Sequence, residues 1–303
     1  MNPQALMDGL VAGSMIGLGA VGITLTYSIL RFANFAHGEL ISSGAYFALL
    51  VASALGALFG GMSTPIGPFS FGWAVPVAAV VAFALNGALA LLIDWLLFGR
   101  LRRQSATIII MVMASFGAAL TLRSLLEFIF TSSPAYYSRS LQIANSLGGG
   151  IRATPDQLLS LLVAAILVVA IHILLTRTAI GRSMRAVSEN PQLAGVVGIE
   201  VRQIIRVVWL LGAGLAAVAG VTAGVLVQIR PQMGFDLLLP LFAAAILGGI
   251  GSVPGAMLAG LIVGLSEAIA VQLVGAEWRA AIAFVILVVV LLFRPQGLFG
   301  RAE

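Results

Sequence analysis

Nine apolar segments follow one another along this chain, and most are long enough to cross a membrane as a helix. A spanning helix needs about 20 predominantly apolar residues. Two segments are short, so one of them is expected to be broken or re-entrant. The candidate spans are 6–30, 38–60, 74–97, 106–130, 157–176, 207–228, 237–250, 255–274 and 280–293, of which 237–250 and 280–293 are the short ones. The sequence therefore predicts an all-α, polytopic transmembrane bundle of eight or nine spans.

The balance of charged and apolar residues supports this fold class. Charged residues make up 9% of the chain and hydrophobic residues 60%, with a mean hydropathy of +1.11. A soluble domain carries about 25% charged residues, so lipid must be part of the solvent of this protein. Residues 1–4 lack the positive charge of a secretory signal, and the first segment is interpreted as a retained membrane helix.

Arginines set the predicted orientation, because positively charged residues are enriched in cytoplasmic loops. If all nine segments cross, the arginine-bearing stretches share one side of the membrane and the N-terminus lies on the other. These stretches are Arg31, Arg100 with Arg102 and Arg103, the loop 177–206, and Arg294 with Arg301. We expect one transmembrane domain over 1–303, a cytoplasmic loop at 177–206, and outward loops at 61–73 and 131–154, the second irregular and exposed.

Several function classes are disfavoured by residues that the chain lacks. All 16 basic residues are arginine, whereas a phosphate-binding P-loop needs a lysine. Cysteine is absent, which excludes disulfides and thiolate metal sites. The two histidines, His37 and His172, are isolated in the sequence, which argues against a metal centre. The net charge of +5 comes from arginines at helix ends, not from a nucleic-acid surface, and no nucleophile–base pair indicates an enzyme.

Two polar stretches that follow glycine-rich segments are weakly similar to each other. The first is RFANFAHGE (31–39), and the second is RPQMGFD (230–236). On the predicted topology they belong to halves that run in opposite directions, as in the inverted repeats of many transporters. An inverted internal repeat is therefore one interpretation. Glycines spaced three or four apart are typical of close packing in a many-helix bundle.

Two segments carry candidate groups for a solute pathway. The stretch 31–39 is either a short solvated turn or a break inside the bundle, where polar groups line a cavity. The stretch 248–255, GGIGSVPG, cannot continue as a regular helix. It is either a tight turn or a backbone-lined constriction. The candidate pathway residues are Asn34, Phe35, His37, Glu39, Gly248, Gly249 and Gly251.

Ionisable residues inside the other apolar segments have simpler interpretations. Arg123 and Glu127 are four residues apart and share a helix face. This spacing favours a structural pair near the outer interface over a substrate role. His172 and Glu267 are single polar groups, each expected to bond to a neighbouring helix, with a proton relay as the alternative.

Three longer motifs point to a known family. They are NFAHGELISSGAY (34–46), GRSMRAVSENPQLAGVVGI (181–199) and AAAILGGIGSVPGAMLAGLIVGLSEA (243–268). With these motifs the chain resembles, essentially end to end, the permease subunits of ABC importers for branched-chain or other hydrophobic amino acids. Permeases for urea, other amides and simple sugars share parts of this pattern, so the solute stays open.

The resemblance implies a division of labour in a bacterial cytoplasmic (inner) membrane. Two cytoplasmic ATPase subunits bind ATP and Mg, and a periplasmic binding protein delivers the solute. A second related permease subunit completes the pathway as a heterodimer, with a homodimer as the alternative. A short helix near 189–197 is expected to rest in a groove of the ATPase, where small residues let it come close. The residues assigned to this coupling are Gly181, Arg182, Arg185, Glu189, Asn190, Pro191, Ala194, Gly195 and Gly198.

Two other mechanisms stay open beside this one. An ion-coupled secondary transporter would use Glu39, His172 or Glu267 as its titrating group. A passive channel would carry a small neutral solute such as urea.

Overall fold

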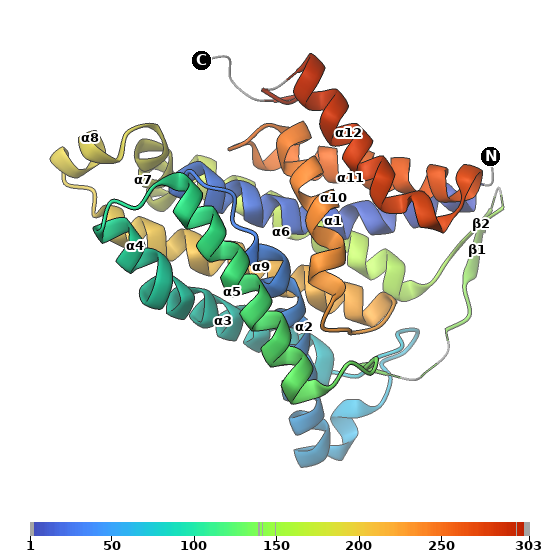
Figure 1. Cartoon of the computed structure of the whole chain (residues 1–303). Coiled ribbons are helices and arrows are strands. Elements are labelled where there is room, and N and C mark those ends of the chain that lie inside the picture. Colours follow the sequence, from blue (N-terminus) through green and yellow to red (C-terminus); the bar gives the residue numbers. More distant parts are fainter. Residues whose placement is uncertain (1–2, 139, 141, 149, 295, 300–303) are drawn as a thin grey trace.

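The computed structural model describes residues 3–138, 140, 142–148, 150–294 and 296–299. Within them, eight helices are long and apolar enough to cross a membrane, and a ninth apolar helix, α10 (Met233–Gly248), has 16 residues. This confirms the predicted polytopic bundle of eight or nine spans (Figure 1). The long helices are α1 (Gln4–Leu30), α2 (Ala36–Leu58), α3 (Ala74–Ile93) continued through a π-helical turn by α4 (Gly99–Arg103), α5 (Ile108–Phe130), α6 (Pro155–Arg177), α9 (Val201–Leu226) and α11 (Val253–Val274). The eighth span joins a 3-10 turn (Ala276–Trp278) to α12 (Arg279–Phe293) and has 18 residues in all.

Helix α1 lies at the centre of the bundle. In its most apolar window 83% of the residues are buried, against 17% in α5 and 6% in the span that contains α12. Helix α11 packs along it, and a Cβ atom on Gly13 would lie 2.7 Å from the Cα of Leu261. Such an approach is open only to glycine, which agrees with the close helix packing that the glycine spacing predicts.

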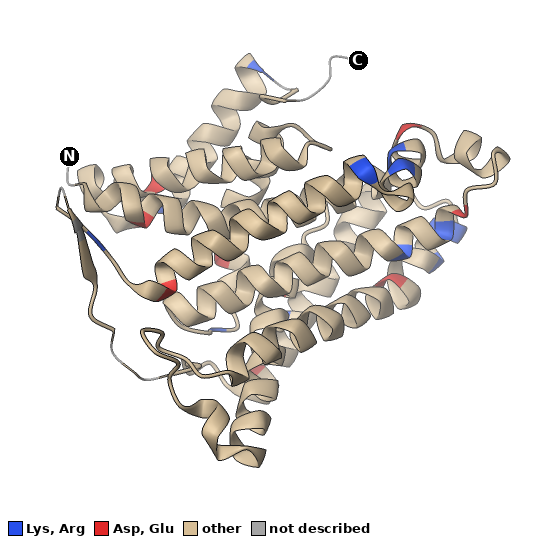
Figure 2. Cartoon of the chain, turned by 180° about the vertical axis from the view of Figure 1, so that it is seen from behind, with Lys and Arg blue, Asp and Glu red and all other residues tan. Residues whose placement is uncertain are grey.

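Arginines gather at one end of the bundle, which we call the arginine-rich end (Figure 2). It carries α4 together with two short helices, α7 (Ala179–Glu189) and α8 (Pro191–Val196). At the opposite end α1 begins, and the Gln4 side chain donates a 3.0 Å hydrogen bond to the carbonyl of Arg152. This distribution fits one cytoplasmic face. Arg301, which also entered the predicted orientation, lies outside the described residues.

Helix α10 makes a ninth passage although it is short. Before it, Ala135 and Ile229 exchange backbone hydrogen bonds of 2.9 and 2.8 Å, which places this part of the chain at the opposite end. After it, the amide of Leu298, beyond α12, donates 2.7 Å to the carbonyl of Leu247. An irregular segment, 227–232, therefore completes the passage of α10, which crosses and does not re-enter.

The chain between α1 and α2 returns into the bundle before a new helix forms. His37, in the first turn of α2, lies 3.2 Å through its Nε2 from the carbonyl oxygen of Gly19. Gly19 lies eleven residues before the end of α1, about 16 Å inside the bundle. Helix α2 therefore begins near mid-depth.

Four helices have the opposed directions that an inverted repeat requires. Helix α1 ends at the arginine-rich end, where α9 begins, and each is followed by an irregular segment and a further helix, α2 or α10. The two second helices meet at their first turns, because a Cβ atom on Gly38 would lie 2.6 Å from the carbonyl oxygen of Gly234. The repeat over the rest of the chain stays a prediction.

The described residues of the segment 131–154 are mostly exposed, as predicted, but the segment is not irregular throughout. It contains an antiparallel hairpin of β1 (Asn145–Gly148) and β2 (Ile151–Ala153), turned at Gly150 with φ +82°. Glycine adopts this left-handed conformation without strain. Nearer α5, the Tyr137 hydroxyl donates 2.8 Å to the carbonyl of Ala45, and burial raises the pKa of Tyr137, which keeps the phenol a neutral donor.

Candidate functional site

Helices α7 and α8 occupy the loop for which the sequence predicts ATPase coupling. The Thr178 hydroxyl accepts from the amide of Gly181 (3.1 Å) and so caps α7. The Asn190 side chain accepts from the amides of Gln192 and Leu193, both at 3.0 Å, and Pro191 occupies the first helical position of α8. The predicted helix start at Asn190-Pro191 is confirmed, and α8 lies within the predicted range 189–197.

Helix α7 is fixed to the ends of two spanning helices. A side chain on Gly181 would collide with the carbonyl of Leu175 at the end of α6. The Arg185 guanidinium donates to that same carbonyl, and the Arg31 guanidinium, just after α1, donates to the carbonyl of Ser188. A force applied to α7 would therefore reach both α1 and α6.

The outward face of α8 is apolar, and it is not formed by the small residues that the sequence singled out. Leu193, Val196 and Val197 are 61%, 83% and 69% exposed. Gly195 has open space around it, but Ala194 is only 2% exposed and packs inward. The expectation that Ala194 itself lets a partner come close is therefore wrong in its detail. The missed signal was an apolar trio inside an otherwise polar loop.

The remaining residues assigned to coupling flank this apolar face. Arg182 and Glu189 are exposed on α7. Gly198, just beyond α8, has φ +87°. This conformation favours glycine and turns the chain back toward α9.

Beyond the exposed Arg31, the stretch 32–39 is buried or half-buried, so its interpretation as a solvated turn is wrong. Asn34, His37 and Glu39 are all buried. The Asn34 side chain accepts from the amide of Ala36 (3.1 Å), and the amide of Phe35 donates to the hydroxyl of Ser115 on α5 (3.1 Å). The structure places the break inside the bundle, where irregular backbone is tolerated when protein or a cavity surrounds it.

His37 is held in one tautomer by this placement. The carbonyl of Gly19 can only accept a hydrogen bond, so the Nε2 of His37 carries the proton. Its Nδ1 is then an acceptor that no described residue satisfies.

The glycine turn at 248–252 lies apart from the central break. Phe35 reaches α10 at Phe242, whereas Gly248 follows six residues later, about 9 Å nearer the arginine-rich end. A side chain on Gly248 would collide with Gly255, and Gly249 and Gly251 have φ +90° and +94°. These contacts favour the interpretation as a tight turn, and the structure does not bring it together with Asn34, His37 and Glu39.

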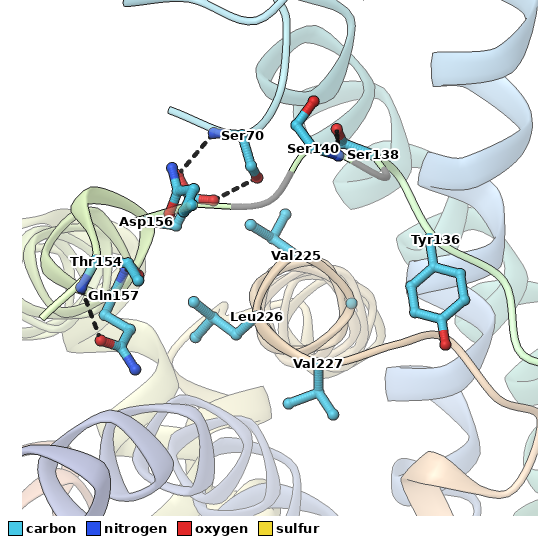
Figure 3. Close-up of a pocket in the computed structure, with 12 residues that line it drawn as sticks. Ser70, Tyr136, Ser138, Ser140, Thr154, Asp156, Gln157, Val225, Leu226 and Val227 are labelled. Atoms are coloured by element: carbon cyan, nitrogen blue, oxygen red, sulfur yellow. Dashed lines mark hydrogen bonds between the residues drawn. The ribbon is translucent and has the colours of Figure 1, made fainter. Parts of the chain in front are cut away.

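A cavity of about 500 Å³, lined by both polar and apolar residues, opens at the end opposite the arginines (Figure 3). Asp156, in the first turn of α6, is buried beside it and accepts from the amide of Ser70 (3.2 Å), the hydroxyl of Ser70 and the side chain of Gln142 (2.9 Å). One carboxylate thus joins α6 to two loops 86 and 14 residues away. Sequence reasoning missed Asp156, because neither loop is its neighbour in the chain.

Replacing Asp156 by alanine is expected to loosen these loops. The change takes the acceptor from the amide and hydroxyl of half-buried Ser70, at a cost of up to about 1–3 kcal/mol for each group, whereas the Gln142 side chain keeps its bond to the carbonyl of Pro68 (2.8 Å). We expect faster proteolysis of the segment 131–144 in membrane vesicles that expose this end, and a lower melting temperature of the purified protein. Asp156→Asn, which keeps one acceptor oxygen, should have a smaller effect. Equal cleavage of Asp156→Ala and wild type would contradict this role.

Known proteins match the chain over nearly its whole length. A family model described as "Branched-chain amino acid transport system / permease component" matches residues 5–291. The permease protein BraD of a high-affinity branched-chain amino acid transport system from Pseudomonas aeruginosa is 32% identical over 99% of this chain and 96% of its own length.

Two further relatives come from a bacterium and an archaeon. LivH from Escherichia coli, named as a permease of the same kind of system, is 30% identical over 99% of this chain and 96% of its own length. A probable LivH from Methanocaldococcus jannaschii is 27% identical over 99% and 93%. With its multi-pass helical bundle, the chain belongs to the family of branched-chain amino acid transport system permease components.

Proposed function

We propose that this chain is a membrane-spanning subunit of an ATP-driven ABC importer that carries branched-chain amino acids. The observation that carries the proposal is the family match over residues 5–291, together with relatives of similar length that are named for this cargo. The break between α1 and α2 supports it, because discontinuous helices form the substrate sites of many transporters.

Of the two cytoplasmic ATPase subunits, which bind ATP and Mg, one is proposed to dock on α8 of this chain and the other on the second permease subunit. The exposed apolar residues of α8 lie beyond the spanning helices, at the arginine-rich end. An apolar patch outside the membrane is typical of a protein–protein contact. The chain itself lacks a lysine for a P-loop. Arg182 and Arg185, exposed on α7, suit acidic groups of the ATPase or lipid head groups.

Two more partners complete the proposed importer. A second related permease subunit covers the exposed face of α5, a helix with only 17% of its most apolar window buried, as a heterodimer. A periplasmic binding protein delivers the amino acid at the end that carries the cavity beside Asp156. The fixed α7, joined to α1 and α6, would transmit movement of the ATPases to the bundle.

The test is uptake by the reconstituted transporter. The proteoliposomes contain both permease subunits and the ATPases, with the loaded binding protein outside and ATP inside. We expect them to accumulate radiolabelled leucine. A non-hydrolysable ATP analogue should stop accumulation. Omitting the binding protein should also lower uptake to the level of empty vesicles.

Two outcomes would favour the other mechanisms. Leucine accumulation that follows a proton or sodium gradient without ATP would support an ion-coupled transporter. Non-saturating flux of urea that needs no binding protein would support a channel.

A further inference from the structure

An ion pair lies on the partly exposed face of α5, inside the membrane-spanning part of the chain. The Arg123 Nε lies 3.3 Å from the Oε1 of Glu127, and the two side chains are 25% and 36% exposed. Arg123 is fifteen residues into α5, about 22 Å from the arginine-rich end of this helix. Charges at such depth face water or protein, because exposure to lipid is costly. This side of α5 therefore faces an aqueous path or a second subunit.

A buried acid lies close to this pair. Glu39 is 1% exposed, and neither carboxylate oxygen has a hydrogen-bond donor among the described residues. Ser42 lies within its reach but donates its hydroxyl proton to the carbonyl of Pro231 (3.0 Å). Asp236, exposed in the first turn of α10, follows Phe235, whose ring faces the Arg123 guanidinium, and Glu39 follows Gly38, which meets Gly234 of that same turn. We call these four groups the charged layer: Glu39, Arg123, Glu127 and Asp236.

The charged layer has groups left to bind both an anion and a cation. Within the described part of the chain, Arg123 donates one hydrogen bond, through Nε to Glu127, and its terminal nitrogens stay available. A guanidinium presents its remaining N–H groups as a fork that matches a carboxylate. Glu39, in turn, needs a cation or a donor, because a buried carboxylate without one is costly.

Aromatic rings bracket the charged layer on both sides. Toward the arginine-rich end, the Phe35 ring lies between Phe116 of α5 and Phe242 of α10, with centroid distances of 6.2 and 5.3 Å. Toward the opposite end, Tyr46 stacks on Phe130 at 4.4 Å. Phe116 and Phe130 each lie seven residues from Arg123, about 10 Å along the helix. The rings offer apolar surface above and below the charges along α5.

We propose that the charged layer is a transient binding site for the zwitterionic head group of an amino acid that crosses the membrane. The Arg123 guanidinium takes the carboxylate, and the Glu39 and Asp236 carboxylates take the ammonium group. The apolar side chain lies against Phe116 and against Phe235, whose ring centroid is 5.3 Å from the Arg123 guanidinium. This inference rests on the proposed function, since it assigns residues to the same cargo. It replaces the purely structural role that the spacing of Arg123 and Glu127 predicts.

A cysteine reporter tests the site directly, because the natural chain has no cysteine. Leu120→Cys introduces a thiol at an exposed position three residues from Arg123 on α5. In the assembled transporter with cysteine-free partners and no binding protein, we expect this thiol to react with a membrane-impermeant thiosulfonate. Leucine should slow the reaction, whereas isocaproate, which lacks the ammonium group, and isoamylamine, which lacks the carboxylate, should not. Ile166→Cys, exposed on α6, is the matched control and should stay unreactive.

Variants of the ion pair separate recognition from structure. Arg123→Gln in the reporter is expected to raise the half-protecting leucine concentration about tenfold or more, with normal assembly. The exchange of Arg123→Glu together with Glu127→Arg keeps an ion pair but moves the guanidinium, and protection should stay lost. Full protection in the exchanged variant, or equal protection by isocaproate, would overturn the site. Either result leaves the proposed function intact. The proposed function fails instead if the wild-type transporter does not accumulate leucine when ATP is supplied.

Discussion

Replacing Gly234 by leucine should prevent the bundle from closing at its centre. Gly234 is where the first turns of α2 and α10 meet, and any side chain on it would collide with the backbone of Gly38. Backbone atoms cannot move aside as a flexible side chain can, so the two helices would have to separate. Overpacking alone costs about 1–3 kcal/mol, and separating helices that begin inside the membrane also breaks the Ser42 contact with the Gly234 amide (2.9 Å).

The measurement is the yield of monodisperse protein in detergent and its melting temperature. We expect Gly234→Leu to give little folded protein. Gly60→Leu is the matched control, because no atom lies near the position of its Cβ, and it should behave as wild type. Wild-type yield and melting of Gly234→Leu would mean that α2 and α10 do not meet as described.

The helix content and the range of eight or nine spans follow from the sequence, because apolar length predicts a spanning helix. That the short α10 also crosses is shown only by its contacts. The partner of each glycine does not follow, since the spacing on α1 shows that a backbone approaches but not which one. Gly13, for example, packs on α11, from 248 residues further along the chain. Such pairs depend on close packing between segments that are distant in the sequence, and the local residue pattern does not predict them.

The candidate sites also contain features that the sequence predicts and features that only the fold decides. The start of α8 was predictable, because Asn190 and Pro191 cap a helix through local bonds alone. Which face of α8 is exposed was not, because that depends on how α7 and α9 hold it. This is why Ala194 was expected at the surface although it is buried, and why Leu193 and Val196 were overlooked. The three-way contact of Asp156 likewise joins loops that only the fold brings together.

Replacing Val196 by aspartate is expected to uncouple the permease from its ATPases while the bundle stays folded. Val196 is 83% exposed, so a carboxylate there stays in water and costs this chain little. In the docked complex, the same carboxylate would be buried against an apolar groove without a partner, which is strongly unfavourable. We expect co-purification of the ATPases to fall sharply and ATP-driven leucine uptake to drop about tenfold or more, since a buried unpaired charge costs several kcal/mol.

The choice of Val196 matters because a bulky residue at buried Ala194 would distort α8 itself and could not separate misfolding from lost docking. The control is Val274→Asp, which adds the same charge at a residue that is 58% exposed near the end of α11, at the opposite end of the bundle. It should keep both ATPase binding and uptake. If Val196→Asp also keeps both, α8 does not carry the contact. If it loses uptake but still binds the ATPases, α8 transmits their movement without supplying the binding energy. The next contacts to break are then the bond from Arg31 to Ser188 of α7 and the bond from Arg185 of α7 to Leu175 of α6.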